Sequence, residues 1–247
     1  MTNKKEQEMY SRQIMMKEIG EAGQQKLSKA SVLVVGCGGL GSPVLYYLTA
    51  MGVGHIGICD GDTVSLQNLN RQILFKVDDI GKSKATVARE RLIELNPNLI
   101  TTVYNQFLDE KLAESLIPSY DIVVDCLDNF ETRFILNDVC VNERKPLVHA
   151  GICEYFGQLM TITPGKGPCL RCLFPKGIQK KEDIKPSGVI GPTPGVLGAM
   201  QAMETAKYLL DMKICNDGLV MYNGLELTLE KVKIPASPHC ICMAAGS

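Results

Sequence analysis

The stretch Ser31-Val32-Leu33-Val34-Val35-Gly36-Cys37-Gly38-Gly39-Leu40-Gly41 decides how this chain folds. Its first five residues form a short apolar run, which is typical of a buried strand, and a helical stretch follows it. Gly36, Gly38 and Gly41 have the spacing of a dinucleotide-binding turn, in which backbone approaches phosphate closely, and Gly39 lies in the same loop. The N-terminus of the following helix offers free N–H groups and a positive dipole end to an anion. We therefore expect a nucleotide site at the end of this strand.

Apolar runs and helical stretches alternate from this point to about residue 152. The predicted strands are 31–35, 55–59, 100–104, 121–125 and 146–150, and the predicted helices are 42–51, 82–96, 110–117 and 131–142. Strands that alternate with helices indicate a parallel sheet covered on both faces. The expected fold class is α/β, a Rossmann-like and mostly parallel sheet with helices on both faces that continues into antiparallel strands.

The pattern changes in the second half of the chain. We predict an antiparallel strand at 158–163, a loop at 164–194, a helix at 196–210 and a hairpin at 221–232 that turns at Asn223-Gly224. The chain is expected to form a single domain over residues 1–247. Its parts are an N-terminal helical segment (1–30), a nucleotide-binding half (31–152) and a second half (153–247).

The composition excludes several classes of function. A net charge of −1 over 247 residues gives no long-range attraction for nucleic acid or an anionic membrane. No apolar run approaches the roughly 20 residues that span a bilayer, and the first eight residues are polar. We expect a cytoplasmic protein that binds neither nucleic acid nor membrane.

Charged residues follow several of the predicted strands. Asp60 ends the second strand, where an acidic side chain can accept hydrogen bonds from ribose hydroxyls, and Asp62 is expected to shape the loop. Arg71, Lys84 and Asp128 also fall at or near the carboxyl edge of the predicted sheet. Two cations and an aspartate beside a ribose site suit a triphosphate with Mg²⁺. An NAD(P)-dependent oxidoreductase would also use the glycine loop, but it would leave these three residues without roles.

Nine of the ten cysteines fall into two groups. Five lie in apolar runs and are expected to be buried free thiols: Cys37, Cys59, Cys126, Cys140 and Cys153. Cys169-x-x-Cys172 has the spacing of half a metal site, and a second pair near the C-terminus would complete a tetrahedral structural zinc site. Cys240 with Cys242 is the favoured second pair, and His239 with Cys242 is the alternative.

In combination, these motifs resemble the ThiF/MoeB/HesA group, whose members are relatives of the ubiquitin-activating enzymes. The resemblance covers nearly the whole chain in the right order. It is carried by Ser11-Arg12-Gln13, the glycine loop, Asn68-Leu69-Asn70-Arg71-Gln72, Gly81-Lys82-Ser83-Lys84, Asp125 to Asn129, Pro168-Cys169-Leu170-Arg171-Cys172 and Gly188-Val189-Ile190-Gly191-Pro192.

The resemblance implies an ATP-dependent adenylyltransferase. Its substrate would be the C-terminal Gly-Gly carboxylate of a ThiS- or MoaD-like sulfur-carrier protein, which is related to ubiquitin. A terminal carboxylate has a pKa of about 3.5 and is already a nucleophile at neutral pH, so no general base is needed. The implied roles are Mg²⁺ binding by Asp128, phosphate neutralisation by Lys84 and Arg71, phosphate orientation by Asn68 and Gln72, ribose binding by Asp60, nucleotide binding by Asn129, and a contact from Arg12 to the phosphates of a neighbouring subunit. The expected assembly is a homodimer.

One departure from the family pattern bears on function. Members that transfer the acyl group to their own thiol carry a cysteine in the loop before Gly-Val-x-Gly, and residues 180–187 contain none. The enzyme is then expected to stop at the adenylate and to use a separate sulfur donor. Cys153 would substitute only if the fold brought it to the adenylate, and its strand context argues against that.

Several alternatives stay open at this point. One alternative substrate is a small-molecule or peptide carboxylate. In another alternative the chain is an inactive scaffold. The pathway would be that of thiamine or of molybdopterin. A basic run in the loop would guide an acidic partner or would only be solvated: Lys176, Lys180, Lys181 and Lys185.

Overall fold

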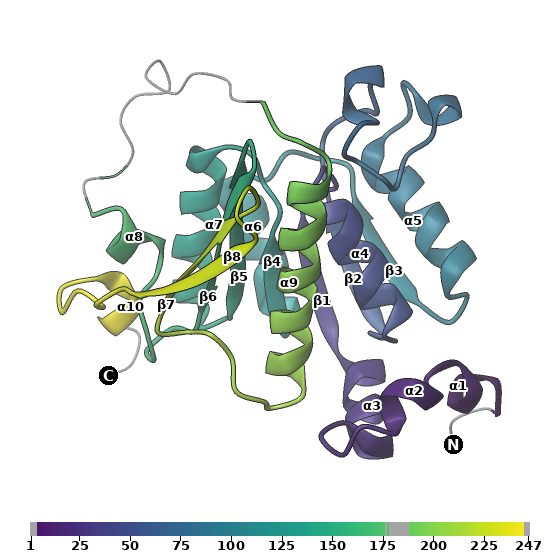
Figure 1. The fold of residues 1–247 in the computed structure, drawn as a ribbon, viewed down its shortest axis with the longest axis horizontal. Coiled ribbons are helices and arrows are strands. Elements are labelled where there is room, and N and C mark those ends of the chain that lie inside the picture. Colours follow the sequence, from purple (N-terminus) through teal and green to yellow (C-terminus); the bar gives the residue numbers. More distant parts are fainter. Residues whose placement is uncertain (1–3, 176, 178–187, 245–247) are drawn as a thin grey trace.

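The structure is a computed structural model that describes residues 4–175, 177 and 188–244 (Figure 1). Within these residues, eight strands form one sheet in the order β3-β2-β1-β4-β5-β6-β7-β8. The strands are β1 (Ser31–Val35), β2 (His55–Cys59), β3 (Ile100–Tyr104), β4 (Ile122–Asp125), β5 (Leu147–Cys153), β6 (Phe156–Ile162), β7 (Gly218–Asn223) and β8 (Thr228–Lys233). Strands β1 to β5 are parallel, and β6, β7 and β8 each pair antiparallel with their neighbours. The predicted fold class is confirmed.

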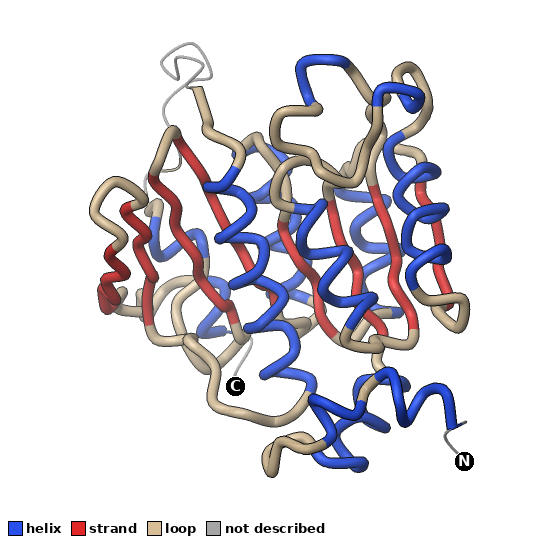
Figure 2. The backbone as a smooth tube through the Cα atoms, turned by 45° about the vertical axis from the view of Figure 1, so that its right-hand side comes forward, coloured by secondary structure: helices blue, strands red, loops and turns tan. Residues whose placement is uncertain are grey.

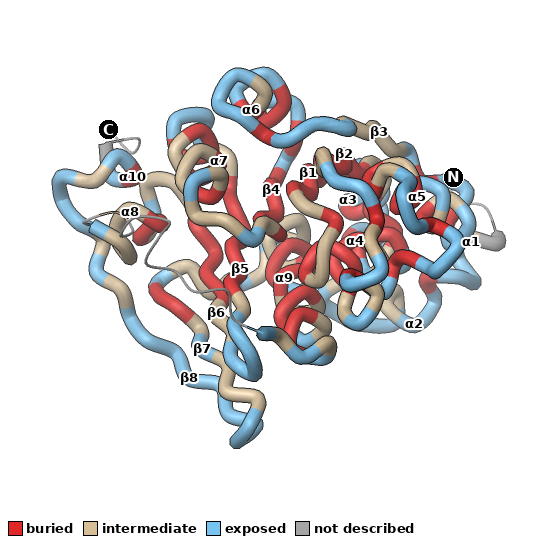
Figure 3. The backbone as a smooth tube through the Cα atoms, turned by 90° about the horizontal axis from the view of Figure 1, so that it is seen from above, coloured by how far each residue is buried: buried red, intermediate tan, exposed pale blue. Residues whose placement is uncertain are grey.

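Helices cover both faces of the sheet (Figures 2 and 3). They are α1 (Lys4–Met9), α2 (Ser11–Ile14), α3 (Gly20–Lys29), α4 (Gly41–Ala50), α5 (Lys84–Leu95), α6 (Glu110–Leu116), α7 (Phe130–Asn142), α8 (Leu170–Leu173), α9 (Pro192–Leu209) and α10 (Ile241–Ala244), with 3-10 turns at Leu66–Asn68, Val77–Asp79 and Ile117–Ser119. Strand β1 explains the two layers, because its side chains alternate between faces. Val32 and Val34 pack with α4, α5 and α9, whereas Leu33 and Val35 pack with α6 and α7. No helix among the described residues is long and apolar enough to cross a bilayer.

Between residues 4 and 29 the chain forms three helices instead of the single helical stretch that was predicted over the first thirty residues. Gly20, at the start of α3, has a φ of 56°, a left-handed conformation that glycine adopts without strain. Tyr10 is buried, and its hydroxyl accepts a hydrogen bond of 3.0 Å from Asn96 Nδ2. The three helices lie at the amino ends of the parallel strands, where α3 leads directly into β1 (Figure 1).

The second half of the chain differs from prediction at several element bounds. The strand predicted at 158–163 is β6 at Phe156–Ile162, and the loop predicted at 164–194 contains the short helix α8. Helix α9 starts at Pro192 instead of residue 196, because proline suits the first turn of a helix, where its missing N–H costs nothing. The predicted turn of the last hairpin was Asn223-Gly224, but the strands are joined by residues 224–227. The side chain of Asn223 organises this longer turn, since its Oδ1 accepts hydrogen bonds from the N–H groups of Leu225 and Glu226.

Candidate active site

The glycine loop between β1 and α4 is closely packed against the loop that follows β4. Gly36 has a φ of 97°, and a Cβ built there would lie 2.6 Å from the carbonyl oxygen of Cys126. A Cβ at Gly41 would lie 2.0 Å from the carbonyl oxygen of Gly36. Neither distance is compatible with a side chain, so the turn requires glycine at both positions. The first turn of α4 then points its N–H groups at the space above β1.

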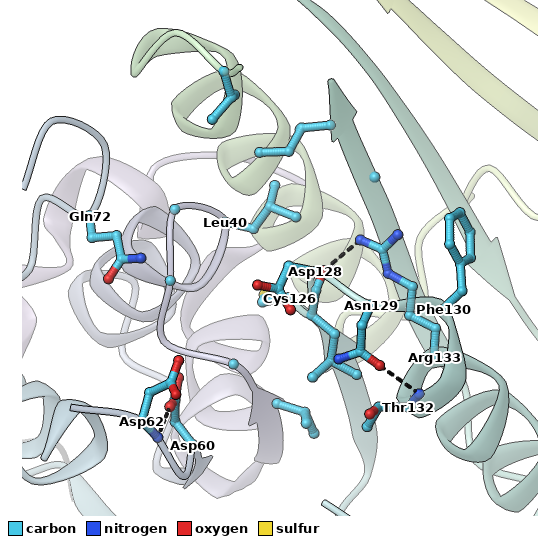
Figure 4. A pocket seen from close by; sticks show the side chains of 18 of the residues that line it. Leu40, Asp60, Asp62, Gln72, Cys126, Asp128, Asn129, Phe130, Thr132 and Arg133 are labelled. Atoms are coloured by element: carbon cyan, nitrogen blue, oxygen red, sulfur yellow. Dashed lines mark hydrogen bonds between the residues drawn. The ribbon is translucent and has the colours of Figure 1, made fainter. Parts of the chain in front are cut away.

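A cavity of about 850 Å³ opens at the carboxyl ends of the parallel strands (Figure 4). Its lining includes Gly39, Leu40, Phe107 and Val189, which come from three separate loops. Nine of the predicted site residues line it: Gly36, Gly38, Gly39, Asp60, Arg71, Gln72, Lys84, Asp128 and Asn129. Residues that are scattered over about ninety positions of the sequence are therefore brought to one place.

Asp60 connects the end of β2 to the glycine loop. Its Oδ2 accepts a hydrogen bond of 2.6 Å from the N–H of Cys37, and its Oδ1 accepts one of 2.8 Å from the N–H of Asp62. Burial raises the pKa of this carboxyl above its ordinary value, and the two backbone donors oppose that effect. A carboxylate oxygen has more than one lone pair, so both oxygens can still accept hydrogen bonds from ribose hydroxyls.

The two cationic side chains that were predicted to neutralise phosphate are held in different ways. Lys84 is buried, and its Nζ lies 2.9 Å from Oδ2 of Asp62, so Asp62 carries a charge partner in addition to shaping its loop. Arg71 Nη1 donates to the carbonyl of Gln67 and to Oδ1 of Asn70, each at 3.0 Å, and the arginine lines the cavity. A polyanion in the cavity would meet both cations at their existing positions.

Two amides of the Asn68–Gln72 motif are used differently. Asn68 lies outside the cavity lining, and its Oδ1 accepts a hydrogen bond of 3.3 Å from the N–H of Ser65. Gln72 lines the cavity and is 5% exposed, and its Oε1 is buried without a hydrogen-bond partner. A buried amide oxygen without a partner is costly, so Gln72 is the member of this motif that is ready to accept a donor from a ligand.

Asp128 and Asn129 follow β4 on the other side of the cavity, opposite Asp60 (Figure 4). Asp128 is exposed, so its carboxylate is free of the packing that holds Asp60. Asn129 caps α7, since its Oδ1 accepts a hydrogen bond of 2.9 Å from the N–H of Thr132. Asp128 thus occupies a fixed position between the end of a strand and a capped helix.

Arg133 is a cavity residue that sequence reasoning missed. It is 6% exposed, and its Nη2 donates to the carbonyl oxygens of Leu127, at 2.5 Å, and Ala150, at 3.0 Å. Its guanidinium also lies over the ring of Phe130, 5.3 Å from the centroid. An arginine one turn into a helix that starts at the carboxyl edge was the available signal, because such a side chain can turn back toward that edge.

A buried polar chain lies beneath the same part of the cavity. Oδ2 of Asp125 is 2.6 Å from Nδ1 of His149, and both side chains are fully buried. Nε2 of His149 is 3.5 Å from Nε2 of Gln158, a half-buried residue that lines the cavity. Neither His149 nor Gln158 was identified from the sequence.

Arg12 lies on α2, which is at the amino ends of the strands and therefore at the far end of the sheet from the cavity (Figure 1). Its side chain is exposed and is absent from the cavity lining. Within one chain, then, Arg12 does not join the other predicted site residues.

Cys153 corrects one expectation. It was predicted to be buried and to lie away from the site, but it is exposed and lines the cavity. The reason is its position as the last residue of β5, where the β5–β6 hairpin leaves the packed layers. The other four cysteines that were predicted to be buried are buried: Cys37, Cys59, Cys126 and Cys140. The loop at 180–187, with its lysines and its missing cysteine, and Lys176 lie outside the described residues.

The predicted cluster of four cysteines is present. The Sγ atoms of Cys169, Cys172, Cys240 and Cys242 all lie within 4.8 Å of one another, with 3.5 Å between Cys169 and Cys240 and 3.6 Å between Cys172 and Cys242. His239 is exposed and is not a member of the cluster. Zn–S bonds of about 2.3 Å in a tetrahedron place sulfurs about 3.8 Å apart, so the four thiols fit a zinc ion.

The fold and the cavity are those of a nucleotide-binding α/β protein, in which the glycine turn, acidic residues at strand ends and two cations meet at one edge of the sheet. The chain belongs to the ThiF family, which its residues 10–244 match.

Individual relatives match most of the chain. It is 41% identical over 241 residues to the SAMP-activating enzyme E1 of Haloferax volcanii, covering 96% of this chain and 89% of that protein. It is also 41% identical over 247 residues to the sulfur carrier protein adenylyltransferase of Thermus thermophilus, covering 96% and 90%. It is 42% identical over 228 residues to adenylyltransferase and sulfurtransferase MOCS3 of Xenopus laevis, covering 91% of this chain and 51% of the relative. The chain thus spans about half the length of that relative.

A solved structure shares the fold. E. coli MccB, in a structure with MccA-N7isoASN, superimposes with a TM-score of 0.84 at 26% identity, covering 96% of this chain and 74% of that one.

Proposed function

We propose that this chain is an ATP-dependent adenylyltransferase that activates the C-terminal Gly-Gly carboxylate of a ThiS- or MoaD-like sulfur carrier as an acyl-adenylate. The observation that carries the proposal is one cavity lined by Gly38, Asp60, Arg71, Lys84 and Asp128. The relatives from H. volcanii and T. thermophilus are named as an activating enzyme and a sulfur carrier adenylyltransferase, which supports the same reaction class.

The reaction needs positioning and charge neutralisation. An oxygen of the substrate carboxylate attacks the α-phosphorus of ATP, the bond from that phosphorus to the bridging oxygen breaks, and pyrophosphate leaves with the bonding electrons. No proton has to be removed, because the carboxylate is ionised at neutral pH. Lys84 and Arg71 reduce the repulsion between the anionic substrate and the phosphates, and Asp60 holds the ribose. Such fixed charges act strongly in a site that excludes water.

Both metals have candidate ligands. Asp128 offers an exposed carboxylate in the cavity, which suits Mg²⁺ because this ion is usually held by one or two carboxylates together with phosphate oxygens. Mg²⁺ would supply further neutralisation of phosphate charge. Cys169, Cys172, Cys240 and Cys242 would hold zinc as a closed set of four, which leaves no position for water and makes the site structural.

A homodimer is part of the proposal. Arg12 is exposed at the opposite end of its own sheet, so its implied phosphate contact would be made in the cavity of a second copy. Each cavity would then contain residues of both chains.

The fate of the adenylate is a finer point. Residues 180–187 carry no cysteine, so we propose that the adenylate passes to a separate sulfur donor, in thiamine or molybdopterin synthesis. The alternative substrate is a small-molecule or peptide carboxylate. An oxidoreductase reading is disfavoured, because a nicotinamide dinucleotide has no need of Asp128, Arg71 and Lys84 together.

The test is ATP–pyrophosphate exchange with Mg²⁺. Purified chain is assayed with ThiS-like and MoaD-like proteins that end in Gly-Gly, with the same proteins lacking the last two residues, and with a panel of small carboxylic acids. We expect exchange only with an intact carrier, and the carrier that works identifies the pathway. Exchange that requires only a small acid would replace the carrier by that acid, and no exchange with any of them would contradict the proposed activity.

A further inference from the structure

The hydrogen-bonded series Asp125–His149–Gln158 has no role in the reaction as described so far. Asp125 and His149 are fully buried, and Gln158 is the member that reaches the cavity. A buried polar network is costly unless every group is satisfied, and it then fixes the orientation of its members. The hydrogen bonds of Asp125 and His149 therefore determine how the amide of Gln158 is oriented.

The protonation state of His149 sets that orientation. Burial lowers the pKa of His149, against the opposing influence of Asp125, so the ring is neutral at neutral pH. Nδ1–H then donates to Oδ2 of Asp125 at 2.6 Å, which leaves Nε2 as an acceptor. The neighbour of Nε2 at 3.5 Å is Nε2 of Gln158, so the glutamine donates one N–H inward. Its carbonyl oxygen, Oε1, is left for the cavity.

Gly151 leaves space for the contact between Gln158 and His149. It is the cross-strand partner of Gln158 in the β5–β6 pair, and His149 lies two residues before it. A Cβ at Gly151 would come within 3.2 Å of Nε2 and 3.3 Å of Cγ of Gln158. The side chain of Gln158 therefore lies against the backbone of Gly151 near His149, and a methyl group at 151 would require it to shift by a few tenths of an ångström.

The position of Gln158 separates it from the nucleotide. Asp60 and the glycine loop follow β2 and β1, whereas Gln158 lies on β6, beyond β4 and β5 in the sheet. Its neighbour on the other side is Met221 of β7, which also lines the cavity. The β5–β6–β7 side is the part of the cavity left for the acyl substrate once the nucleotide occupies the β1–β2 side.

We propose that Gln158 is a specificity-determining residue that accepts a hydrogen bond from a backbone N–H in the C-terminal tail of the substrate, with His149 and Asp125 as positioning residues. The inference rests on the proposed function and deepens it. It names the recognised group as a peptide N–H, so the preferred substrate is a polypeptide C-terminus and not a simple carboxylic acid.

The test joins a change in the protein to a change in the substrate. The carrier that supports exchange is prepared by semisynthesis with its last residue either as glycine or as N-methylglycine, which lacks the N–H. Both are assayed with the wild-type chain, with Gln158→Leu, and with Gln25→Ala as a control on an exposed glutamine of α3. The KM values for carrier and for ATP are measured separately, together with the melting temperature of each variant.

We expect N-methylation to raise the carrier KM about tenfold for the wild-type chain and for Gln25→Ala, as loss of one hydrogen bond predicts. Gln158→Leu should raise the KM for unmodified carrier by a similar factor, leave the KM for ATP within about twofold, and show no further loss on methylation, because the interacting pair is already broken. Gly151→Ala should show a weaker form of this pattern, because its methyl group shifts the amide only slightly.

Three results would count against this inference or its basis. An equal methylation loss in Gln158→Leu and wild type would overturn the proposed contact. A Gln158→Leu variant whose melting temperature falls and whose two KM values rise together would assign the residue a structural role and overturn recognition. Absence of exchange with any carrier in the wild-type chain would remove the proposed function itself, which is a separate outcome.

Discussion

The cysteine cluster and the nucleotide cavity both join segments that are far apart in the chain, but they do so with opposite kinds of side chain. In the cluster, four thiols face one another within 4.8 Å and leave no ligand position open. In the cavity, Asp128 is exposed, and Oε1 of the buried Gln72 has no partner. A group of ligands that is complete within the chain indicates a structural role, whereas polar atoms left without partners indicate a place for a substrate.

Breaking the cluster should give the largest effect. We expect about one zinc per chain, and Cys172→Ser should lose the metal and lower the free energy of unfolding by on the order of 5 kcal/mol, because metal binding is coupled to folding. Metal analysis and thermal unfolding measure both changes. Cys215→Ser, a partly exposed cysteine outside the cluster, is the control. A wild-type chain without zinc, or a Cys172→Ser chain as stable as the wild type, would refute the structural zinc site.

Removing the open carboxylate of the cavity should affect activity and not folding. Asp128→Ala should lower the rate of ATP–pyrophosphate exchange by about 10²- to 10³-fold, which is typical for loss of one fixed electrostatic partner. Its melting temperature should stay close to that of the wild type, because the side chain is exposed. Asp78→Ala changes an exposed carboxylate outside the cavity lining and serves as the control. Full exchange activity in Asp128→Ala would refute the assignment.

A mixing experiment tests whether the cavity is completed by a second chain. Arg12→Ala and Asp128→Ala chains should each be inactive alone. After random mixing, half of the dimers would contain one intact site of two, so activity should return to about a quarter of the wild-type value. Exchange is measured before and after mixing, and each variant mixed with itself is the control. No recovery, with subunit exchange verified by mass spectrometry, would contradict a shared site.

The smallest effect concerns Cys153. Because it is exposed and lines the cavity, a thiol reagent should modify it readily, and saturating ATP with Mg²⁺ should slow the modification several-fold. Peptide mapping by mass spectrometry follows the rate at this cysteine. Cys215, outside the cavity lining, should show the same rate with and without nucleotide. Equal rates at Cys153 would place it away from bound ligand.

Much of the fold could be predicted because local pattern and tertiary environment agree. The strands 31–35, 55–59 and 100–104 were predicted with the bounds that the structure has. The first two are short apolar runs, which is typical of buried parallel strands. The third is the partly exposed edge strand of the sheet. The two breaks of the N-terminal segment, at Tyr10 and before Gly20, were not predicted. At the first break Tyr10 is buried against Asn96, a contact between segments that are far apart in the sequence. A single residue can interrupt a helical pattern when its neighbours in space favour the break.

The site residues also divide into those with a local sequence pattern and those that depend on contacts in space. The positions of Asp60 and Asp128 at the cavity and of the cysteine pairs in the cluster could be predicted, because strand ends and metal spacings leave a signature in sequence order. His149 and Gln158 could not be predicted, because their contact arises from pairing across strands. For Arg133 the only signal was its position one turn into α7, since its contact with Ala150 joins a helix to a strand. Cys153 was misjudged for a related reason. A residue at the end of an apolar strand looks buried in sequence, although the hairpin that follows carries it to the cavity.

One feature of the cavity rim has a practical use. Phe156, the first residue of β6, is 42% exposed and lines the cavity beside the proposed acyl site. The chain contains no tryptophan. A Phe156→Trp chain would therefore carry a single indole, placed where a polypeptide tail would cover it. Its fluorescence would report the arrival of substrate without a background signal from any other position, so binding could be timed independently of the chemical step.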